Sequence, residues 1–461
     1  MAQDSSPLDV APLRAELSGA VHAPGDDGYD AARQSWNLAV DQHPAAVVEV
    51  ASPEDVAAAL AFALGNGLRV APQRTGHGAG PVGPLGEALL LRTGGLGGVE
   101  VDPAARRARI GAGVLWGEVA EAAGRHELSV LHGSSPTVGV VGFLLGGGIG
   151  WQTRAQGLAC NSVTAVELVT PAGERVRATA ESEPDLFWAL RGGGAGFGVV
   201  TAVEIELFPL AEAYAGMIAW PAERGPEVLD AYREWIAGLP ETVTSAVRYL
   251  TLPPLPEIPE PLRAVPLIDV TAAFAGGEAE GAELLAPLRA LGDPIVDTYA
   301  AMPAAGLCRI NGDPEEPVPG VADGGMIGAL TAEACAALTE TAGPGSGSTL
   351  LAAQLRHMRG AASRVPDGAG ALGRLDGEIV YSAVGMPGLG GEPEQVLADI
   401  ARVQQALAPA GNGRRYLNFA ERPTTASEFF DPETLARLSA IRTAIDPDDL
   451  LLSNHAVPVA A

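Results

Sequence analysis

Lysine is absent from this sequence of 461 residues, so all 29 of its Lys and Arg positions are arginine. They are outnumbered by 56 Asp and Glu residues, which leaves a formal net charge of −27. A chain this acidic repels phosphate backbones and anionic lipid surfaces, so we expect neither a nucleic acid nor a membrane as its partner. Without lysine, the chain also has no residue for a Schiff base, a pyridoxal-phosphate anchor or a Walker-type phosphate loop.

Cysteine is scarce as well. Cys160, Cys308 and Cys335 lie far apart with no C-x-x-C pair, which fits a reducing compartment and argues against a disulfide framework. The histidines show no ligand spacing, so we expect no metal site. No secretory signal is visible at the N-terminus, and the longest apolar run, 139–151, is too short to span a membrane. We therefore expect a cytoplasmic protein and interpret this glycine-rich run as a packed loop.

The hydrophobic pattern predicts an opening β-α-β unit. A short apolar strand at 46–50 is followed by Ser52, a suitable N-cap, and by a helix that ends near Gly65 before a second strand at 68–71. The pattern predicts further strands at 88–91, 99–101, 107–111, 163–170, 175–178 and 199–207, and helices at 116–123 and 184–191. After residue 210 the chain alternates proline-rich loops with alanine-rich helices and short strands such as 379–384, which indicates a second domain.

Glycine is concentrated in three clusters, at 76–83, 133–150 and 192–198. Glycine permits positive φ and lets the backbone approach a ligand closely, so several such loops can direct N–H groups at one anion. The pyrophosphate of a cofactor suits this pattern best, although tight turns in a glycine-rich sequence are an alternative for any single loop. The G-x-G-x-x-G at 78–83 is not a dinucleotide fingerprint, because Pro81 and Pro84 prevent the required helix.

A histidine stands among the first of these glycines, in Arg74-Thr75-Gly76-His77-Gly78. A constrained turn after a strand is an unusual place for a core histidine. A neutral imidazole is a nucleophile, so His77 could bond covalently to an electrophilic carbon of a cofactor.

Four ordered motifs carry a family resemblance. The loop at 74–78 is similar to R-x-G-G-H-S, and 133–150 is similar to G-x-C-P-T-V-G followed by L-G-G-G-x-G. The stretch 184–201 is similar to D-L-F-W-A-L-R-G-G-G-G-N-F-G-V-V-T, and 416–419 to Y-x-N-Y/F. Together they resemble the FAD-linked oxidases of the vanillyl-alcohol-oxidase superfamily, berberine-bridge-enzyme-like branch, most strongly over about 45–207 and 414–458.

This resemblance implies an α+β, bilobed FAD-binding fold with an inserted antiparallel-sheet substrate domain. The implied domains are 1–210 for FAD, 211–411 for substrate, and 412–461 as a return to the FAD domain. It also implies that His77 is linked to FAD through the 8α-methyl group. The cofactor-binding residues expected from the matched motifs are Arg74, Thr75, Gly76, His77, Gly78, Gly133, Ser134, Ser135, Thr137, Val138, Gly139, Gly142, Gly196, Val199 and Asn418.

The departures from the family pattern sharpen these expectations. Ser135 stands where many relatives have a second flavin-linking cysteine, so we predict a single covalent link. Val138 occupies the oxygen-gating position, where valine goes with oxygen access in the family. Phe419 replaces a second tyrosine, which leaves Tyr416 as the first candidate for the base that takes the hydroxyl proton. Tyr381, on a predicted strand, is the second candidate, and an ordinary packed aromatic is the alternative for each.

The sequence thus predicts an FAD-dependent oxidase that acts on a hydroxyl or related C–H bond of a small molecule, a sugar or secondary metabolite, and reduces O₂ to H₂O₂. Two alternatives remain open at this point. One is a flavin dehydrogenase with another electron acceptor, and the other is a non-catalytic metabolite-binding or resistance protein with the same fold.

Overall fold

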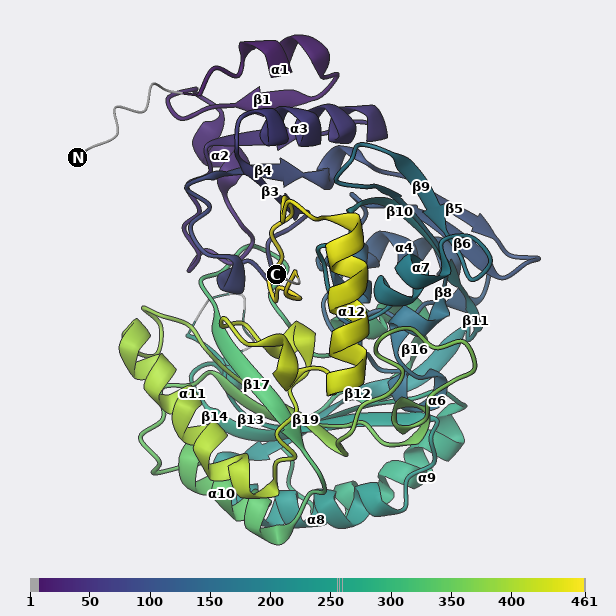
Figure 1. The fold of residues 1–461 in the computed structure, drawn as a ribbon. Helices are drawn as coiled ribbons and strands as arrows, with labels where there is room; N and C mark the ends of the chain where they lie inside the picture. Colours follow the sequence, from purple (N-terminus) through teal and green to yellow (C-terminus); the bar gives the residue numbers. More distant parts are fainter. Residues whose placement is uncertain (1–7, 255, 257, 259, 460–461) are drawn as a thin grey trace.

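The computed structural model describes residues 8–254, 256, 258 and 260–459. Figure 1 shows a part built mainly from the N-terminal half above a large sheet, with the C-terminal segment between them. The longer helices are α3 (Pro53–Gly65), α4 (Trp116–Gly124), α8 (Gly225–Ala237), α9 (Glu278–Arg289), α10 (Ala332–Ala342), α11 (Pro393–Leu407) and α12 (Pro432–Ile445). The shorter ones are α1 (Ala11–Glu16), α2 (Tyr29–Arg33), α5 (Val140–Leu145), α6 (Thr153–Gln156) and α7 (Pro184–Ala189).

The first sheet confirms the opening unit predicted from the hydrophobic pattern. Its order is β1-β2-β4-β3, formed by β1 (Ala20–His22), β2 (Ala46–Glu49), β3 (Arg69–Gln73) and β4 (Ala88–Arg92). Strands β2 and β3 both run parallel to β4, which lies between them. The Ser52 side chain caps α3 by accepting a hydrogen bond from the Asp55 N–H at 3.1 Å.

A second sheet of antiparallel pairs follows in the order β5-β6-β10-β8-β9. Its strands are β5 (Val99–Asp102), β6 (Arg107–Gly111), β8 (Val163–Val169), β9 (Arg175–Ala178) and β10 (Val199–Glu206). The strands predicted at 163–170 and 175–178 form the antiparallel β8–β9 pair. A two-stranded ribbon of β7 (Leu128–Ser129) and β11 (Phe208–Pro209) closes this region.

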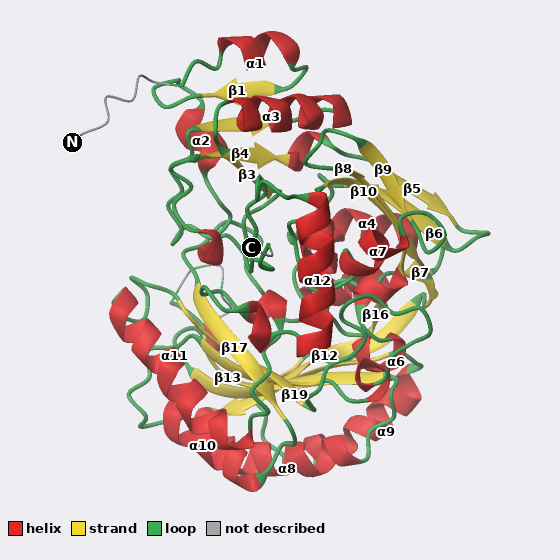
Figure 2. Cartoon of the chain, in the orientation of Figure 1, coloured by secondary structure: helices red, strands yellow, loops and turns green. Residues whose placement is uncertain are grey.

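The large sheet has the order β15-β12-β14-β13-β18-β19-β17, and β16 also pairs with β12. Its strands are β12 (Glu212–Pro221), β13 (Val243–Thr251), β14 (Pro266–Phe274), β15 (Val296–Asp297), β16 (Ala300–Pro303), β17 (Val321–Ile327), β18 (Ala352–His357) and β19 (Ile379–Gly385). Helices α8 to α11 line its outer face (Figure 2). Because side chains alternate along a strand, every second residue points instead toward the N-terminal half.

The two faces of this sheet differ in chemistry. The helix-covered face is apolar and includes Val247, Tyr249 and Leu355 in one buried cluster. The opposite face carries charged side chains, since Arg248 on β13 pairs in register with Asp269 on β14 and with Gln354 on β18. The polar face is therefore the one that positions a site between the two parts of the molecule.

The C-terminal segment returns to the first sheet. Val70 on β3 donates its backbone N–H to Leu450 and accepts from the N–H of Leu452, each at 2.8 Å. Arg69 pairs with Asp449 at 2.7 Å. Helix α12 lies above the large sheet in the view of Figure 1 and contacts α7. The boundary predicted at 210/211 falls in the short link between β11 and β12.

One expectation is wrong in part. The run 139–151 was expected to be a packed loop, but it begins with helix α5 over Val140–Leu145. Gly139 is its N-cap and Gly146 its C-cap, so most of these glycines lie at or beyond the helix ends, where they do not disrupt it. Only Gly142 lies inside the helix.

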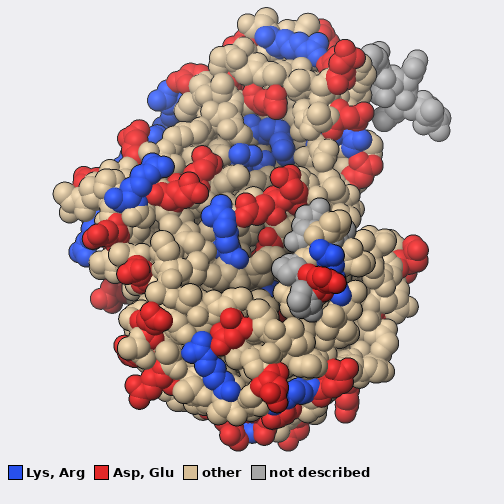
Figure 3. Space-filling view, turned by 180° about the vertical axis from the view of Figure 1, so that it is seen from behind, with Lys and Arg blue, Asp and Glu red and all other residues tan. Residues whose placement is uncertain are grey.

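No helix in the described ranges is long and apolar enough to cross a membrane. On the face drawn in Figure 3, arginine side chains are interspersed with Asp and Glu.

Candidate active site

His77 lies on the turn after β3, and its ring stacks on Trp36 with the ring centroids 3.9 Å apart and the planes inclined by 15°. Its Nδ1 is hydrogen-bonded to Thr75 Oγ1 at 2.9 Å, while Nε2 is buried and has no partner. Burial lowers the pKa of His77 to about 4, so the imidazole is neutral at neutral pH. With the proton on Nδ1, Nε2 keeps a free electron pair, which is what a nucleophile requires.

Two arginines lie together beside this turn. The Arg74 Nε donates to the carbonyl of Gly113, and the stem of Arg74 packs at Gly139, where a Cβ would lie 3.1 Å from Arg74 Cγ. The Arg92 Nη1 is buried without a partner, and burial together with the nearby Arg74 charge lowers the pKa of Arg92. Adjacent guanidinium groups with an unused donor suit a phosphate group. The sequence analysis missed Arg92, because it ends an ordinary strand.

In the second glycine cluster, 133–150, helix α5 has an exposed side at Gly142. Gly142 is exposed, and nothing lies within 4 Å of where its Cβ would be. Val138 and Phe143 beside it are only partly buried. Val138 and Phe143 pack against the core on one side, and together with Gly142 they leave a partly accessible apolar surface, which suits the flat aromatic ring of a flavin.

The loop before this helix is tied to the loop that carries Asp313, between β16 and β17. Ser134 Oγ donates to Asp313 Oδ2 at 3.0 Å, and Ser135 Oγ lies 3.0 Å from Thr137 Oγ1. Gly133 is needed for close packing, since a Cβ there would lie 2.9 Å from the Phe143 ring.

The third glycine cluster packs against protein. Gly196 has φ +109°, and its Cα is covered by the Arg442 guanidinium, which donates to the Gly196 carbonyl. Val199 is fully buried on β10 in the core beside Val169. The expectation that Gly196 and Val199 contact the cofactor is therefore not supported, because a buried arginine and the core explain these residues.

The tail motif contacts helix α5. The Asn418 amide donates to the Phe143 carbonyl at 2.9 Å and to the Tyr416 hydroxyl at 3.1 Å. Tyr416 is fully buried, and burial raises its pKa well above the ordinary value. Its hydroxyl is therefore protonated at neutral pH, which favours a role in hydrogen bonding over the predicted role as a base.

The second predicted base is misplaced. Tyr381 belongs to the apolar cluster on the helix-covered face, and its ring lies over Gly325 of the neighbouring strand. Tyr381 pairs in register with Leu355, so the two side chains share that face. We therefore withdraw Tyr381, which the strand parity directs away from the polar face.

That polar face holds a network that the sequence analysis missed. Arg248 pairs with Asp269 at 2.7 Å and donates to the carbonyl of Asn311 at 3.0 Å. The Asn311 amide in turn donates to Asp313 at 2.5 Å, and Asp313 accepts from Ser134. Strand register brings Arg248 and Asp269 together, whereas Asn311, Asp313 and Ser134 lie in loops that tertiary packing brings to them.

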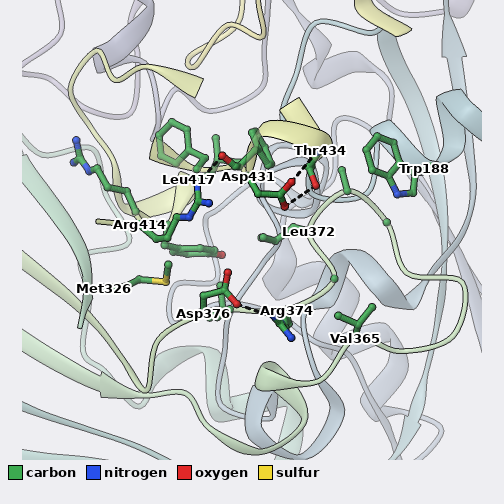
Figure 4. Close-up of a pocket in the computed structure, with 18 residues that line it drawn as sticks. Trp188, Met326, Val365, Leu372, Arg374, Asp376, Arg414, Leu417, Asp431 and Thr434 are labelled. Atoms are coloured by element: carbon green, nitrogen blue, oxygen red, sulfur yellow. Dashed lines mark hydrogen bonds and ion pairs between the residues drawn. The ribbon is translucent and has the colours of Figure 1, made fainter. Parts of the chain in front are cut away.

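A cavity of about 410 Å³ lies beside the tail (Figure 4). Leu417, Asp431 and Thr434 stand on one side of it, opposite Arg374 and Asp376. Its other lining residues are Trp188, Met326, Val365, Gly370, Ala371, Leu372, Gly373, Leu375, Arg414, Arg415, Tyr416, Phe429 and Phe430. The cavity therefore reaches Tyr416 and does not include the His77 turn.

The residues around His77 and α5 fit FAD. The unpartnered His77 Nε2 and Arg92 Nη1 provide a nucleophile and an anion donor, and the apolar strip at Gly142 provides a surface for a ring. Arg74, Arg92 and the loop 133–139 would hold the phosphates and the ribityl chain.

Comparisons with known proteins agree with this fit. Residues 44–179 match the family described as FAD binding domain. The chain is 28% identical to (R)-6-hydroxynicotine oxidase of Paenarthrobacter nicotinovorans over 95% of its length and 96% of the relative. It is 33% identical to glucooligosaccharide oxidase of Sarocladium strictum over 46% of the chain and 44% of the relative. The structure matches that of 6-hydroxy-D-nicotine oxidase from Arthrobacter nicotinovorans with a TM-score of 0.83 and 24% identity over 98% of each chain.

The fold and these matches define a flavoprotein oxidoreductase. The chain is an FAD-binding oxidoreductase similar to the enzymes of the vanillyl-alcohol-oxidase superfamily, berberine-bridge-enzyme-like branch. The predicted family, the α+β fold class, the cofactor FAD and the enzyme class are thereby confirmed.

Proposed function

We propose that this enzyme is a cytoplasmic FAD-dependent oxidase that converts a hydroxyl-bearing carbon, or a related C–H group, of a sugar or secondary metabolite. The substrate R₂CH–OH becomes R₂C=O while O₂ becomes H₂O₂. The observation that carries the proposal is the neutral His77 with its unpartnered Nε2, on the turn that the family uses for FAD. The names of two relatives compared above describe them as oxidases, one of a nicotine derivative and one of an oligosaccharide.

His77 has the chemistry for one covalent link to FAD. Burial keeps its ring neutral, Thr75 orients it, and Trp36 fixes its plane. No thiol is available at Ser135 for a second link. FAD, when bound, accepts a hydride from the substrate and passes the electrons to O₂.

The proton of the substrate hydroxyl needs an acceptor. The Asp313 side chain accepts hydrogen bonds from Ser134 and Asn311, where the glycine loop meets the loop between β16 and β17. Tyr416 is a protonated phenol, which can donate a hydrogen bond to a developing carbonyl. We therefore assign the proton acceptor to Asp313 and keep Tyr416 as a positioning residue.

Spectroscopy of the purified protein tests the function. We expect a yellow protein whose colour remains with the precipitate after acid denaturation, because the flavin is covalently held. A panel of sugars and secondary alcohols, added anaerobically, should contain a compound that bleaches the flavin, and air should restore the colour with formation of H₂O₂.

Each alternative has its own outcome. Bleaching that air does not reverse, but an artificial acceptor does, would indicate a dehydrogenase. Normal flavin loading without bleaching by any compound would favour a binding protein. A colourless protein that takes up no FAD would overturn the proposal.

A further inference from the structure

The most deeply buried arginine of the described chain lacks the partners that buried arginines normally have. Arg356, on β18, is 2% exposed, and its side chain points to the polar face of the large sheet with that of Arg248. Its Nη2 donates to Gln354 Oε1 at 3.2 Å, and its Nε is buried without a partner. Burial lowers its pKa only to about 10, so Arg356 is a cation at neutral pH.

The other buried arginines show what is missing. Arg248 and Arg442 pair with carboxylates. Arg154 and Arg191 each donate to at least two backbone carbonyls. Arg356 has one neutral side-chain acceptor and, among the described residues, no ion pair. A buried cation without a counter-charge is destabilising unless something else supplies the negative charge.

A second unused donor lies next to it. The Arg356 guanidinium is 4.9 Å from the centroid of the Trp151 ring and 5.8 Å from that of Phe419. The indole Nε1–H of Trp151 is buried and also has no acceptor. Buried donors are normally satisfied, so two neighbouring unsatisfied ones point to an acceptor that comes from outside the chain.

The surroundings connect this pair to the proposed active site. Tyr416 and Asp313 are close enough to Arg356 to influence its pKa. Phe419, which replaces the expected second tyrosine, contacts Tyr416 edge to face at 5.3 Å between ring centroids. Phe419 and Asp313 beside the two donors are only partly buried.

We propose that Arg356 and Trp151 form a subsite that binds a carboxylate on the substrate. A carboxylate accepts in-plane hydrogen bonds from a guanidinium edge, and the aromatic rings of Trp151 and Phe419 favour a planar group beside it. The substrate is thus an acid with an oxidisable hydroxyl or C–H group, rather than a neutral sugar. This inference rests on the proposed function for the location of the substrate, but the subsite itself is defined by the two donors.

Calorimetry with a matched pair of ligands tests the subsite without turnover. Benzoate and benzamide have the same shape and differ in charge. We expect the purified holoenzyme to bind benzoate at least tenfold more tightly than benzamide, since a hydrogen bond to a charged group contributes about 1.5–3 kcal/mol, roughly tenfold to a hundredfold. Arg356→Met should abolish this preference, whereas Arg359→Met, which removes an exposed arginine nearby, should leave it unchanged.

A second variant guards against misfolding of Arg356→Met. Gln354→Glu places a carboxylate on the residue that already contacts Arg356, so it should pair with the arginine and weaken benzoate binding at least tenfold. Equal binding of benzoate and benzamide by the wild-type enzyme would overturn the subsite.

The alternative role for the positive charge of Arg356 is to act on the flavin. If Arg356→Met shifts the flavin midpoint potential but keeps the benzoate preference, the arginine serves the cofactor and the proposal is wrong. A protein without flavin that still prefers benzoate would contradict the proposed function and retain the subsite.

Discussion

The proposed cofactor turn and the proposed substrate face of the large sheet are built in different ways. The turn around His77 uses a neutral side chain, backbone and glycine, all within a few residues. The sheet face uses charged side chains such as Arg248, Asp269 and Arg356, each from a different strand. From this comparison we infer that a cofactor shared by a family is held by residues that are close together in the sequence. A particular substrate is instead bound by side chains from different strands, which strand register brings together.

The largest effect should come from the cofactor side. His77→Ala removes the only nucleophile on the turn, so we expect complete loss of covalent flavin. In-gel fluorescence of the denatured protein measures this directly. His126→Ala, at an exposed histidine, should retain full fluorescence. Fluorescence that persists in His77→Ala would show that the flavin is linked elsewhere.

The next largest effect distinguishes the two candidate proton-handling residues, Asp313 and Tyr416, by the rate of flavin reduction in their variants. We expect Asp313→Asn to lower the rate of anaerobic flavin reduction by about 10²- to 10⁴-fold, the contribution typical of a general base. Tyr416→Phe should have a smaller effect, because the phenol is protonated at rest. Stopped-flow reduction with the substrate found in the panel measures both. The reverse order would restore Tyr416 as the base.

On the sheet side, Asp269→Asn should destabilise the protein by about 3–5 kcal/mol, because it leaves the buried Arg248 without a carboxylate. Urea unfolding measures the change. Asp230→Asn, which disrupts an exposed ion pair with Arg233, is the matched control and should leave the midpoint almost unchanged. Similar losses of stability in both variants would mean that the buried Arg248–Asp269 pair contributes no more than the exposed Arg233–Asp230 pair.

The smallest effect concerns the tail between the two regions. Burial, together with the nearby Asp323, raises the pKa of Glu421 from 4.5 to about 7. Between these values the folded chain holds a proton that the unfolded chain releases, so this group lowers stability as the pH rises through that window. Glu421→Gln should therefore match the wild type near pH 4.5 and become the more stable of the two by pH 8. Urea midpoints across that range measure the difference, and a constant offset would contradict the shifted pKa.

How far the site was predictable depends on where its residues lie. His77, Ser134 and Asn418 stand in motifs, so the sequence alone could single them out as candidates. Gly196 belongs to a motif as well, but its freedom from a side chain serves Arg442, more than 240 residues later. A glycine pattern shows that something approaches closely; it does not show whether that is a ligand or another part of the protein.

The sequence by itself determined the family, the cofactor and the first strands and helices, because local hydrophobic period, caps and short motifs are properties of neighbouring residues. Only the tertiary structure decided which face of the large sheet each side chain occupies. That choice moved Tyr381 into an apolar core and brought Arg356 to Trp151 and Asp313. The reason is physical: strand parity and register are set by packing across the whole sheet, and a shift of one residue would exchange its two faces.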